Sequence, residues 1–281
     1  MKKLLTVLLA LTLAITTLSF ATSCKKKGAD ANPTHIIVGA SATPHAEILE
    51  QCKPLLKAKG YTLEIVIYDD YVFPNTAVED GDIDANYFQH LPYLNDFNRS
   101  NGTDIVSVCK VHYEPFGIYG KNVTQSSFDT VKTGRTILIP NDGSNGTRAL
   151  FLLQELGYIT LVSGVSPSDT LTDLDIADSK GNRVVPVTAS EIPAQLKIAN
   201  DGTIGVINGN YALAAGLDIA NALATESATS EAASLYANIL AVAKGNESLP
   251  KIVALKEVLL SETIKNYINS TYGGAVLSVV A

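Results

Sequence analysis

The sequence has little that would support catalysis, a structural zinc site or nucleic-acid binding. It contains no GxSxG elbow, P-loop, GxGxxG or HExxH motif, and its four histidines are scattered at positions 35, 45, 90 and 112. None of the three cysteines belongs to a CxxC or Cys/His cluster, so we expect no structural zinc. The net charge is −7 and there is no basic stripe, which argues against nucleic acid as a partner. These absences favour binding over catalysis, with no metal and no other cofactor.

Long apolar runs are also missing, with one exception at the N-terminus. Two lysines precede the uncharged stretch Leu4–Phe20, and small residues at 21–23 follow it. A basic start, an apolar core and a small-residue cleavage site are typical of a secretory signal peptide, here residues 1–23. The alternative is an uncleaved membrane anchor, although about 17 apolar residues is at the lower edge of what spans a bilayer.

Cys24 follows these small residues directly, as in a bacterial lipobox, in which the cysteine is lipidated and becomes the first residue. Ala21 stands where such motifs usually carry leucine. Three lysines and then small polar residues fill the rest of 24–33, as expected of a flexible tether beside anionic headgroups. A solvated charge run would have the same composition. We expect an exported cell-envelope protein that is anchored to the membrane through lipidated Cys24.

The remaining chain has the composition of a soluble globular protein, with 46% hydrophobic and 17% charged residues overall. Short apolar runs alternate with segments of helical periodicity. The runs that predict strands are 35–40, 63–68, 105–108, 117–119, 136–140, 184–187, 204–207 and 236–242. The segments that predict helices are 44–59, 75–80, 147–156, 190–199 and 252–267. This alternation indicates an α/β protein with mostly parallel sheets.

Two polar stretches, 120–132 and 225–233, are candidate crossing points between two lobes. Strand patterns occur before, between and after them. The chain would then leave the first lobe, build the second and return. We place the first lobe at residues 34–117 plus 235–281 and the second at 118–234.

Arg148 is the first candidate binding residue. A predicted strand ends at Pro140, a Gly/Ser/Asn loop follows, and a helix is expected to begin near Thr147. A cation in the first turn opposes the helix dipole, so gripping a ligand carboxylate would explain its position. A surface arginine in a flexible loop explains the sequence equally well. Asn208 follows another buried strand, where α/β folds bind ligands, but Asn-Gly is also a favoured turn pair.

A third region is dense in aromatic and hydrogen-bonding groups. Phe88, His90 and Tyr93 together would form a rigid, amphipathic pocket wall, and Tyr71 lies just upstream. A single histidine is more often structural than catalytic. The only acid/base pairs that an enzyme could use are His90 with Asp84 or with Glu114.

Several stretches, in order along the chain, resemble the NlpA/MetQ family of substrate-binding lipoproteins. They are YVFPN at 71–75, GDIDANYFQHLPYL at 81–94, VHYEPFGIY at 111–119, IPND with RAL between 139 and 150, INGNYA at 207–212 and YANIL at 236–240. The second and fourth are specific to this family.

The resemblance implies a two-lobed periplasmic-binding-protein (type II) fold with the ligand, methionine, in the interlobe cleft. By position, Arg148 would hold the ligand carboxylate, and Asn208 and Asn238 would meet its amino-acid end. The side-chain pocket would be lined by Tyr71, Phe88, His90 and Tyr93, whose rings suit a thioether. The implied partners are the permease and ATPase of an ABC importer.

The chain departs from the family around the second asparagine, where Leu235 replaces proline and the basic residue is displaced to Lys244. Other amino acids and Met-containing dipeptides are therefore alternative ligands. An enzyme on the same fold and a surface adhesion or scaffold role are alternative functions. Cys52 and Cys109 could pair in an oxidising compartment or stay free thiols.

Overall fold

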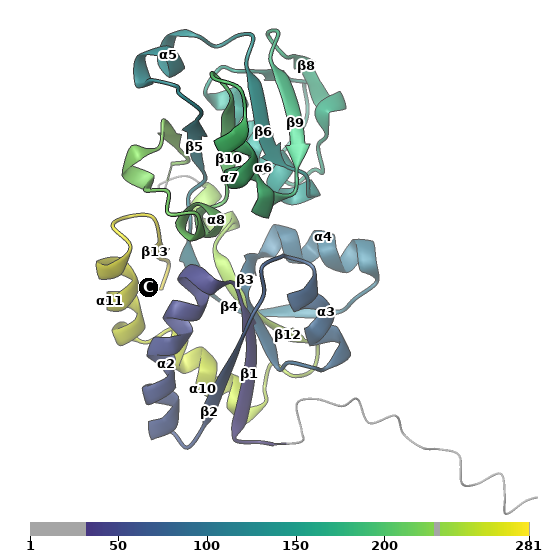
Figure 1. Cartoon of the computed structure of the whole chain (residues 1–281). Helices are drawn as coiled ribbons and strands as arrows, with labels where there is room; N and C mark the ends of the chain where they lie inside the picture. The colour runs from purple at the N-terminus through teal and green to yellow at the C-terminus, as the bar shows by residue number, and fades with distance from the viewer. Residues whose placement is uncertain (1–31, 228–230, 281) are drawn as a thin grey trace, which may run out of the picture.

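The computed structural model describes residues 32–227 and 231–280, which form two lobes stacked one above the other (Figure 1). The expected signal peptide and Cys24 lie outside the described residues. None of the described helices is both long and apolar enough to cross a membrane.

The first lobe is built on a six-stranded sheet with the order β13-β4-β12-β3-β1-β2. Its strands are β1 (His35–Ala40), β2 (Thr62–Ile67), β3 (Ala85–His90), β4 (Ile105–Tyr113), β12 (Asn238–Ala243) and β13 (Leu277–Ser278). β1 pairs in parallel with β2 and β3, whereas β12 lies antiparallel between β3 and β4.

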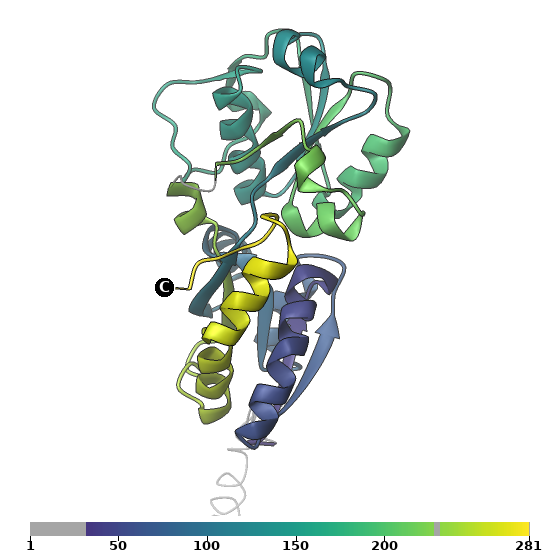
Figure 2. The same ribbon diagram turned by 90° about the vertical axis from the view of Figure 1, so that its left-hand side faces the viewer.

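Helices cover both faces of this sheet. The elements are η1 (Ala42–Ala46), α2 (Glu47–Ala58), α3 (Phe73–Asp80), α4 (Leu91–Asn101), α10 (Pro250–Leu259) and α11 (Glu262–Thr271). α2, α10 and α11 pack side by side on one face (Figure 2) and bury the larger apolar cluster of the lobe. α3 and α4 bury a second cluster on the other face. Each large apolar side chain buried in this way stabilises the lobe by about 1.5–3 kcal/mol.

The second lobe is built on a five-stranded sheet with the order β11-β5-β10-β6-β9. Its strands are β5 (Gly117–Gly120), β6 (Thr136–Pro140), β9 (Arg183–Val187), β10 (Ile204–Ile207) and β11 (Ala224–Thr225). α6 (Gly143–Glu155) packs on one face, and α7 (Ile192–Ile198) with α8 (Gly209–Ala214) packs on the other. Smaller elements of this part of the chain are α5 (Gln125–Thr130), β7 (Thr160–Leu161), η2 (Asp173–Asp175), β8 (Ile176–Asp178), η3 (Ala189–Glu191), η4 (Ile219–Asn221) and α9 (Glu231–Leu235).

The chain crosses between the sheets twice, once between β4 and β5 and once between β11 and β12. The first crossing is only residues 114–116, so the polar stretch 120–132 is not a crossing and the prediction that placed one there is wrong. The second crossing, residues 226–237, overlaps the other predicted stretch. Both sheets are mixed rather than mostly parallel. β5 and β12 are the first strands after the two crossings, and each enters its sheet from the edge that faces the cleft. They are therefore antiparallel to neighbouring strands, whose carboxyl ends lie at that edge.

The elements that differ from the pattern-based expectation include β3, the predicted helix 252–267 and α6. β3 was not predicted as a strand, because its six residues are all buried and half of them are polar. The predicted helix 252–267 is two helices, separated where Ser261 adopts an extended backbone ahead of α11. α6 begins at Gly143 rather than near Thr147, because Asp142 caps it by accepting a hydrogen bond from the Asn145 N–H at 2.9 Å.

Both remaining cysteines belong to the first lobe and are free thiols. Cys52 is buried in α2, where its Sγ contacts the Ile48 carbonyl oxygen at 3.4 Å. Burial raises the pKa of the Cys109 thiol on β4 to about 11. Burial raises the pKa of the Cys52 thiol as well, so both thiols are protonated at neutral pH.

Candidate functional site

A small pocket, partly open to solvent, lies between the two sheets. All seven residues predicted to bind ligand line it, namely Tyr71, Phe88, His90, Tyr93, Arg148, Asn208 and Asn238. Residues from both lobes and from the first crossing complete the lining: Gln89, Glu114, Phe116, Asn145, Gly209 and Asn210. The structure thus brings the predicted residues together around one pocket.

Three aromatic rings of the first lobe form one wall of the pocket. The ring centroids of Tyr71 and Phe88 lie 5.7 Å apart, and those of Tyr71 and Tyr93 lie 5.6 Å apart. The Tyr93 hydroxyl donates to the Tyr71 carbonyl oxygen at 2.9 Å, which fixes the two rings relative to each other. Such an apolar wall with fixed geometry suits an unbranched apolar or thioether side chain.

The same wall closes the cleft against the second lobe. The Tyr71 hydroxyl donates to Asn210 Oδ1 at 2.6 Å, and the Tyr71 ring stacks on that of Tyr211 with centroids 4.8 Å apart. Asn210 and Tyr211 belong to α8, which begins directly after β10. A ligand that completes this contact set would favour the closed arrangement of the lobes.

His90 ends β3 and caps α4. Its Nδ1 accepts a hydrogen bond from the Tyr93 N–H at 3.2 Å, which leaves the proton on Nε2 to donate to Asn145 Oδ1 at 3.1 Å. Burial, together with the nearby charge of Arg148, lowers the pKa of His90 to about 3. His90 is therefore neutral at physiological pH and serves as a donor that links the lobes.

Arg148 is buried, with its guanidinium packed between aromatic rings. Its Cζ lies 3.9 Å from the Phe116 ring centroid and 4.3 Å from that of Tyr236. Because α6 begins at Gly143, Arg148 is in the second turn rather than the first, so its position does not oppose the helix dipole as expected. The ring contacts and burial rule out the alternative of a flexible surface arginine.

Glu226 pairs with Arg148 and was not foreseen. Arg148 Nε donates to the two Glu226 carboxylate oxygens at 3.0 and 3.1 Å, and Nη2 also contacts Oε2. Burial alone would raise the pKa of the Glu226 carboxyl, but Arg148 outweighs this effect and holds that pKa below its ordinary value. The Tyr113 hydroxyl donates to Glu226 at 2.6 Å as well. Arg148 Nη2 further donates to the Glu114 carbonyl oxygen at 2.9 Å.

The asparagines meet the pocket from both lobes. Asn208 Nδ2 donates to Asn145 Oδ1 at 3.1 Å, whereas Asn208 Oδ1 is buried without a hydrogen-bond partner among the described residues. Because buried polar atoms are normally hydrogen-bonded, this oxygen is suited to accept a hydrogen bond from a ligand. Asn145, which the sequence did not single out, is oriented by Asp142, whose carboxylate oxygens accept from its Nδ2 at 3.0 and 3.1 Å.

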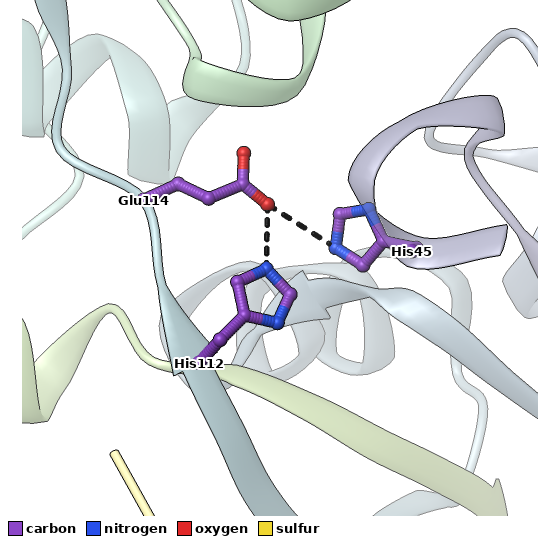
Figure 3. Close-up of side chains that lie close together, drawn as sticks. All are labelled: His45, His112 and Glu114. Atoms are coloured by element: carbon purple, nitrogen blue, oxygen red, sulfur yellow. Dashed lines mark hydrogen bonds and ion pairs between the residues drawn. The ribbon is translucent and has the colours of Figure 1, made fainter. Parts of the chain in front are cut away.

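A buried cluster of His45, His112 and Glu114 adjoins the pocket (Figure 3). Glu114 Oε1 lies 2.7 Å from His112 Nε2 and 3.4 Å from His45 Nε2. His45 Nε2 also hydrogen-bonds Asn238 Oδ1 at 3.0 Å. Burial lowers the pKa of His45 to about 4 and that of His112 to about 3, so both rings are neutral. The three side chains include metal-ligand types. Within the cluster, His112 hydrogen-bonds Glu114, whereas His45 contacts Glu114 and hydrogen-bonds Asn238.

The structure separates one of the two acid/base pairs considered from the sequence. Asp84 Oδ1 forms a buried ion pair with Lys251 Nζ at 2.8 Å, and Asp84 Oδ2 accepts from the Ile37 N–H at 2.9 Å. Asp84 therefore holds β1 in place. His90 and Glu114 both line the pocket, but their hydrogen bonds go to other groups.

Two departures from the family pattern leave the pocket lining intact. Leu235 ends α9, and Tyr236 directly after it covers Arg148 and meets the His90 ring at a centroid distance of 5.1 Å. Asn238 still reaches the pocket. Lys244, the displaced basic residue, is exposed and pairs with Asp104 at 2.9 Å.

Two lobes that enclose a small pocket lined by arginine, asparagine and aromatic side chains define the class of two-lobed solute-binding proteins. A model of the NlpA lipoprotein family matches residues 36–280, and the chain belongs to this family. The family consists of substrate-binding proteins, as the resemblance implied.

Individual relatives agree with this assignment. The chain is 42% identical over 255 residues to the methionine-binding lipoprotein MetQ of Bacillus subtilis (strain 168), covering 90% of each chain. It is similar to the structure of a nutrient binding protein from Burkholderia cenocepacia bound to methionine, with 34% identity, a TM-score of 0.79 and coverage of 87% and 99%. It is also similar to an ABC transporter periplasmic substrate-binding protein from Coxiella burnetii, with 33% identity, a TM-score of 0.78 and coverage of 87% and 100%. The α/β two-lobed fold expected from the sequence is thus confirmed.

Proposed function

We propose that this protein captures methionine outside the cytoplasm and delivers it to the permease and ATPase of an ABC importer. The observation that carries the proposal is one interlobe pocket with three kinds of lining, matched to the three parts of an amino acid. A buried arginine suits the carboxylate, unpaired amide oxygen suits the ammonium, and aromatic rings suit the side chain.

In this proposal Arg148 holds the ligand carboxylate. Its Nε and Nη2 are engaged by Glu226 and the Glu114 carbonyl oxygen, so among the hydrogen bonds of the described residues Nη1 is the guanidinium nitrogen that is left for a ligand. Asn208 and Asn238 meet the amino-acid end. Tyr71, Phe88, His90 and Tyr93 contact the thioether side chain, since sulfur on aromatic rings is a favourable contact.

Capture proceeds by closure of the lobes. The ligand bridges groups of both lobes, so it binds the closed form better than the open form and shifts the population toward closure. The hydrogen bonds Tyr71–Asn210 and His90–Asn145 connect the two lobes directly, with no ligand atom between them. A closed, loaded protein that is anchored to the membrane by lipidated Cys24 would then dock on the permease. The methionine-bound relative from Burkholderia cenocepacia supports this ligand.

Mass spectrometry of the ligand released from denatured, freshly purified protein tests the proposal. The expected result is methionine, followed by a thermal shift with methionine in a screen of the twenty amino acids and a few dipeptides. A shift with another amino acid or a Met-containing dipeptide, and none with methionine, would assign a different solute. Turnover of an amino acid would instead make the protein an enzyme, and an empty cleft with no shift would favour an adhesion or scaffold role.

A further inference from the structure

Glu114 is an acidic side chain of the pocket, and burial raises its pKa. Arg148 and Glu114 are the two formally charged side chains among the described lining residues, and both are buried. Glu226 pairs with Arg148. Glu114 therefore brings an additional acidic group to a buried position, where an isolated carboxylate is unfavourable unless a positive group joins it.

The surroundings of Glu114 orient its carboxylate rather than neutralise it. Glu114 stands in the first crossing, at the junction of the lobes, and its Oε1 faces two neutral histidines (Figure 3). His112 Nε2 hydrogen-bonds Glu114 Oε1 at 2.7 Å, and His112 Nδ1 hydrogen-bonds the Tyr87 hydroxyl. On the other side, a Cβ on Gly209 would lie only 2.8 Å from Glu114 Oε2, so the absence of a side chain there makes room for the carboxylate.

Three acceptors of the lining match the three N–H donors of an ammonium group. Asn208 Oδ1 is buried and unpaired among the described residues. Asn238 Oδ1 has one partner, His45 Nε2, and an amide oxygen accepts two hydrogen bonds. The Glu114 carboxylate has acceptor capacity beyond the bond from His112. Of these three, only Glu114 can supply a full counter-charge.

We propose that Glu114, held by His112, binds the charged α-amino group of the ligand and restricts the pocket to ligands in which that group is a free ammonium. This inference rests on the proposed function, because it takes the ligand to be an amino acid. It assigns Glu114 as a specificity-determining residue. Ligands whose amino group is acylated or replaced by a hydroxyl should be rejected.

The test compares methionine with its 2-hydroxy analogue, which has the same shape and carboxylate but no positive charge. Calorimetry on the full wild-type chain should show methionine binding about 100-fold more tightly, as expected for the loss of a buried charge-assisted hydrogen bond. If another amino acid is the ligand found in the screen, that amino acid and its 2-hydroxy analogue are compared instead.

Glu114→Gln should weaken methionine binding by about 10- to 100-fold and change binding of the hydroxy analogue far less, so that the preference collapses. Glu64→Gln is the matched control, because it removes the carboxylate of an exposed Glu–His pair with His35, and it should keep the wild-type preference. An unchanged preference in Glu114→Gln, or an equal loss for both ligands, would overturn the proposal.

The wild-type comparison needs no variant, so it decides the matter even if Glu114→Gln does not fold. Equal binding of methionine and its hydroxy analogue by the wild type would refute the role of Glu114 and leave the proposed function standing. Failure of the wild type to bind any amino acid would refute the proposed function itself, and the role of Glu114 with it.

Discussion

The buried pair of Arg148 and Glu226 couples ligand affinity to fold stability. Both side chains are nearly inaccessible, 4% and 9% exposed, and they are joined through Nε at 3.0 and 3.1 Å. Arg148→Met leaves the Glu226 carboxylate buried without its cation, and we predict that the free energy of unfolding falls by about 3–5 kcal/mol. Methionine binding should weaken by about 2–4 kcal/mol, because the ligand carboxylate also loses its counter-charge.

The double variant Arg148→Met/Glu226→Gln separates these two effects. Removing both charges leaves no uncompensated ion in the interior, so most of the lost stability should return. Methionine affinity should stay low, because nothing replaces the cation that meets the ligand carboxylate. The exposed pair of Lys59 and Glu257, at 2.9 Å, is the matched control, and Lys59→Met/Glu257→Gln should change stability by less than about 1 kcal/mol.

Urea unfolding without ligand and calorimetry with methionine, both at one fixed pH, measure the two quantities. A double variant as unstable as Arg148→Met would show that the packing of Arg148 between Phe116 and Tyr236, rather than its charge, maintains the fold. A double variant that binds methionine normally would show that Arg148 does not hold the ligand carboxylate.

Three further outcomes follow from the site. Burial lowers the folded-state pKa values of His45, His90 and His112 to about 4, 3 and 3, so below about pH 6.5 the folded state binds fewer protons than the unfolded state. The free energy of unfolding is therefore full above that pH and should fall by up to about 4 kcal/mol by pH 5.5, as measured by urea titrations. A free energy of unfolding that does not change with pH would show that these histidines are not buried in the neutral form. Asn145→Ala leaves two buried donors unpaired, and calorimetry should show methionine binding weakened by about 1–3 kcal/mol; an unchanged affinity would exclude a bridging role. Tyr71→Phe removes one hydrogen bond across the cleft, so affinity should drop by about 1–2 kcal/mol with the melting temperature of the ligand-free protein nearly unchanged; a gain in affinity would contradict its part in closure.

The sequence determined the features that depend on local pattern. Short apolar runs predicted buried strands such as β1, β6 and β10. The spacing of apolar residues and the glycine that follows predicted α2. β3 could not be predicted from the sequence, because its buried polar residues are stabilised by hydrogen bonds to side chains outside the strand. Asn75 Nδ2 donates to Gln89 Oε1 at 3.0 Å, and Asn86 Nδ2 donates to Asn75 Oδ1 at 2.8 Å. A buried polar strand carries no periodic signal until its hydrogen-bond partners are known.

The order of strands within each sheet also depended on the tertiary structure. β12 lies between β3 and β4, although more than a hundred residues separate it from either along the chain. Local patterns predict that a strand exists, but not which strand it pairs with. The sequence therefore predicted an α/β protein, whereas the mixed sheets followed from the crossing geometry.

For the pocket, the sequence by itself determined that binding is favoured over catalysis, and its family motifs supplied the seven residues that now line one space. What only the tertiary structure decided is how these residues are supported. Glu226 meets Arg148 from 78 positions away, and Asn238 meets His45 from 193 positions away. The charge, hydrogen-bond state and orientation of a buried side chain depend on partners that are distant in the sequence, so no local pattern could reveal them.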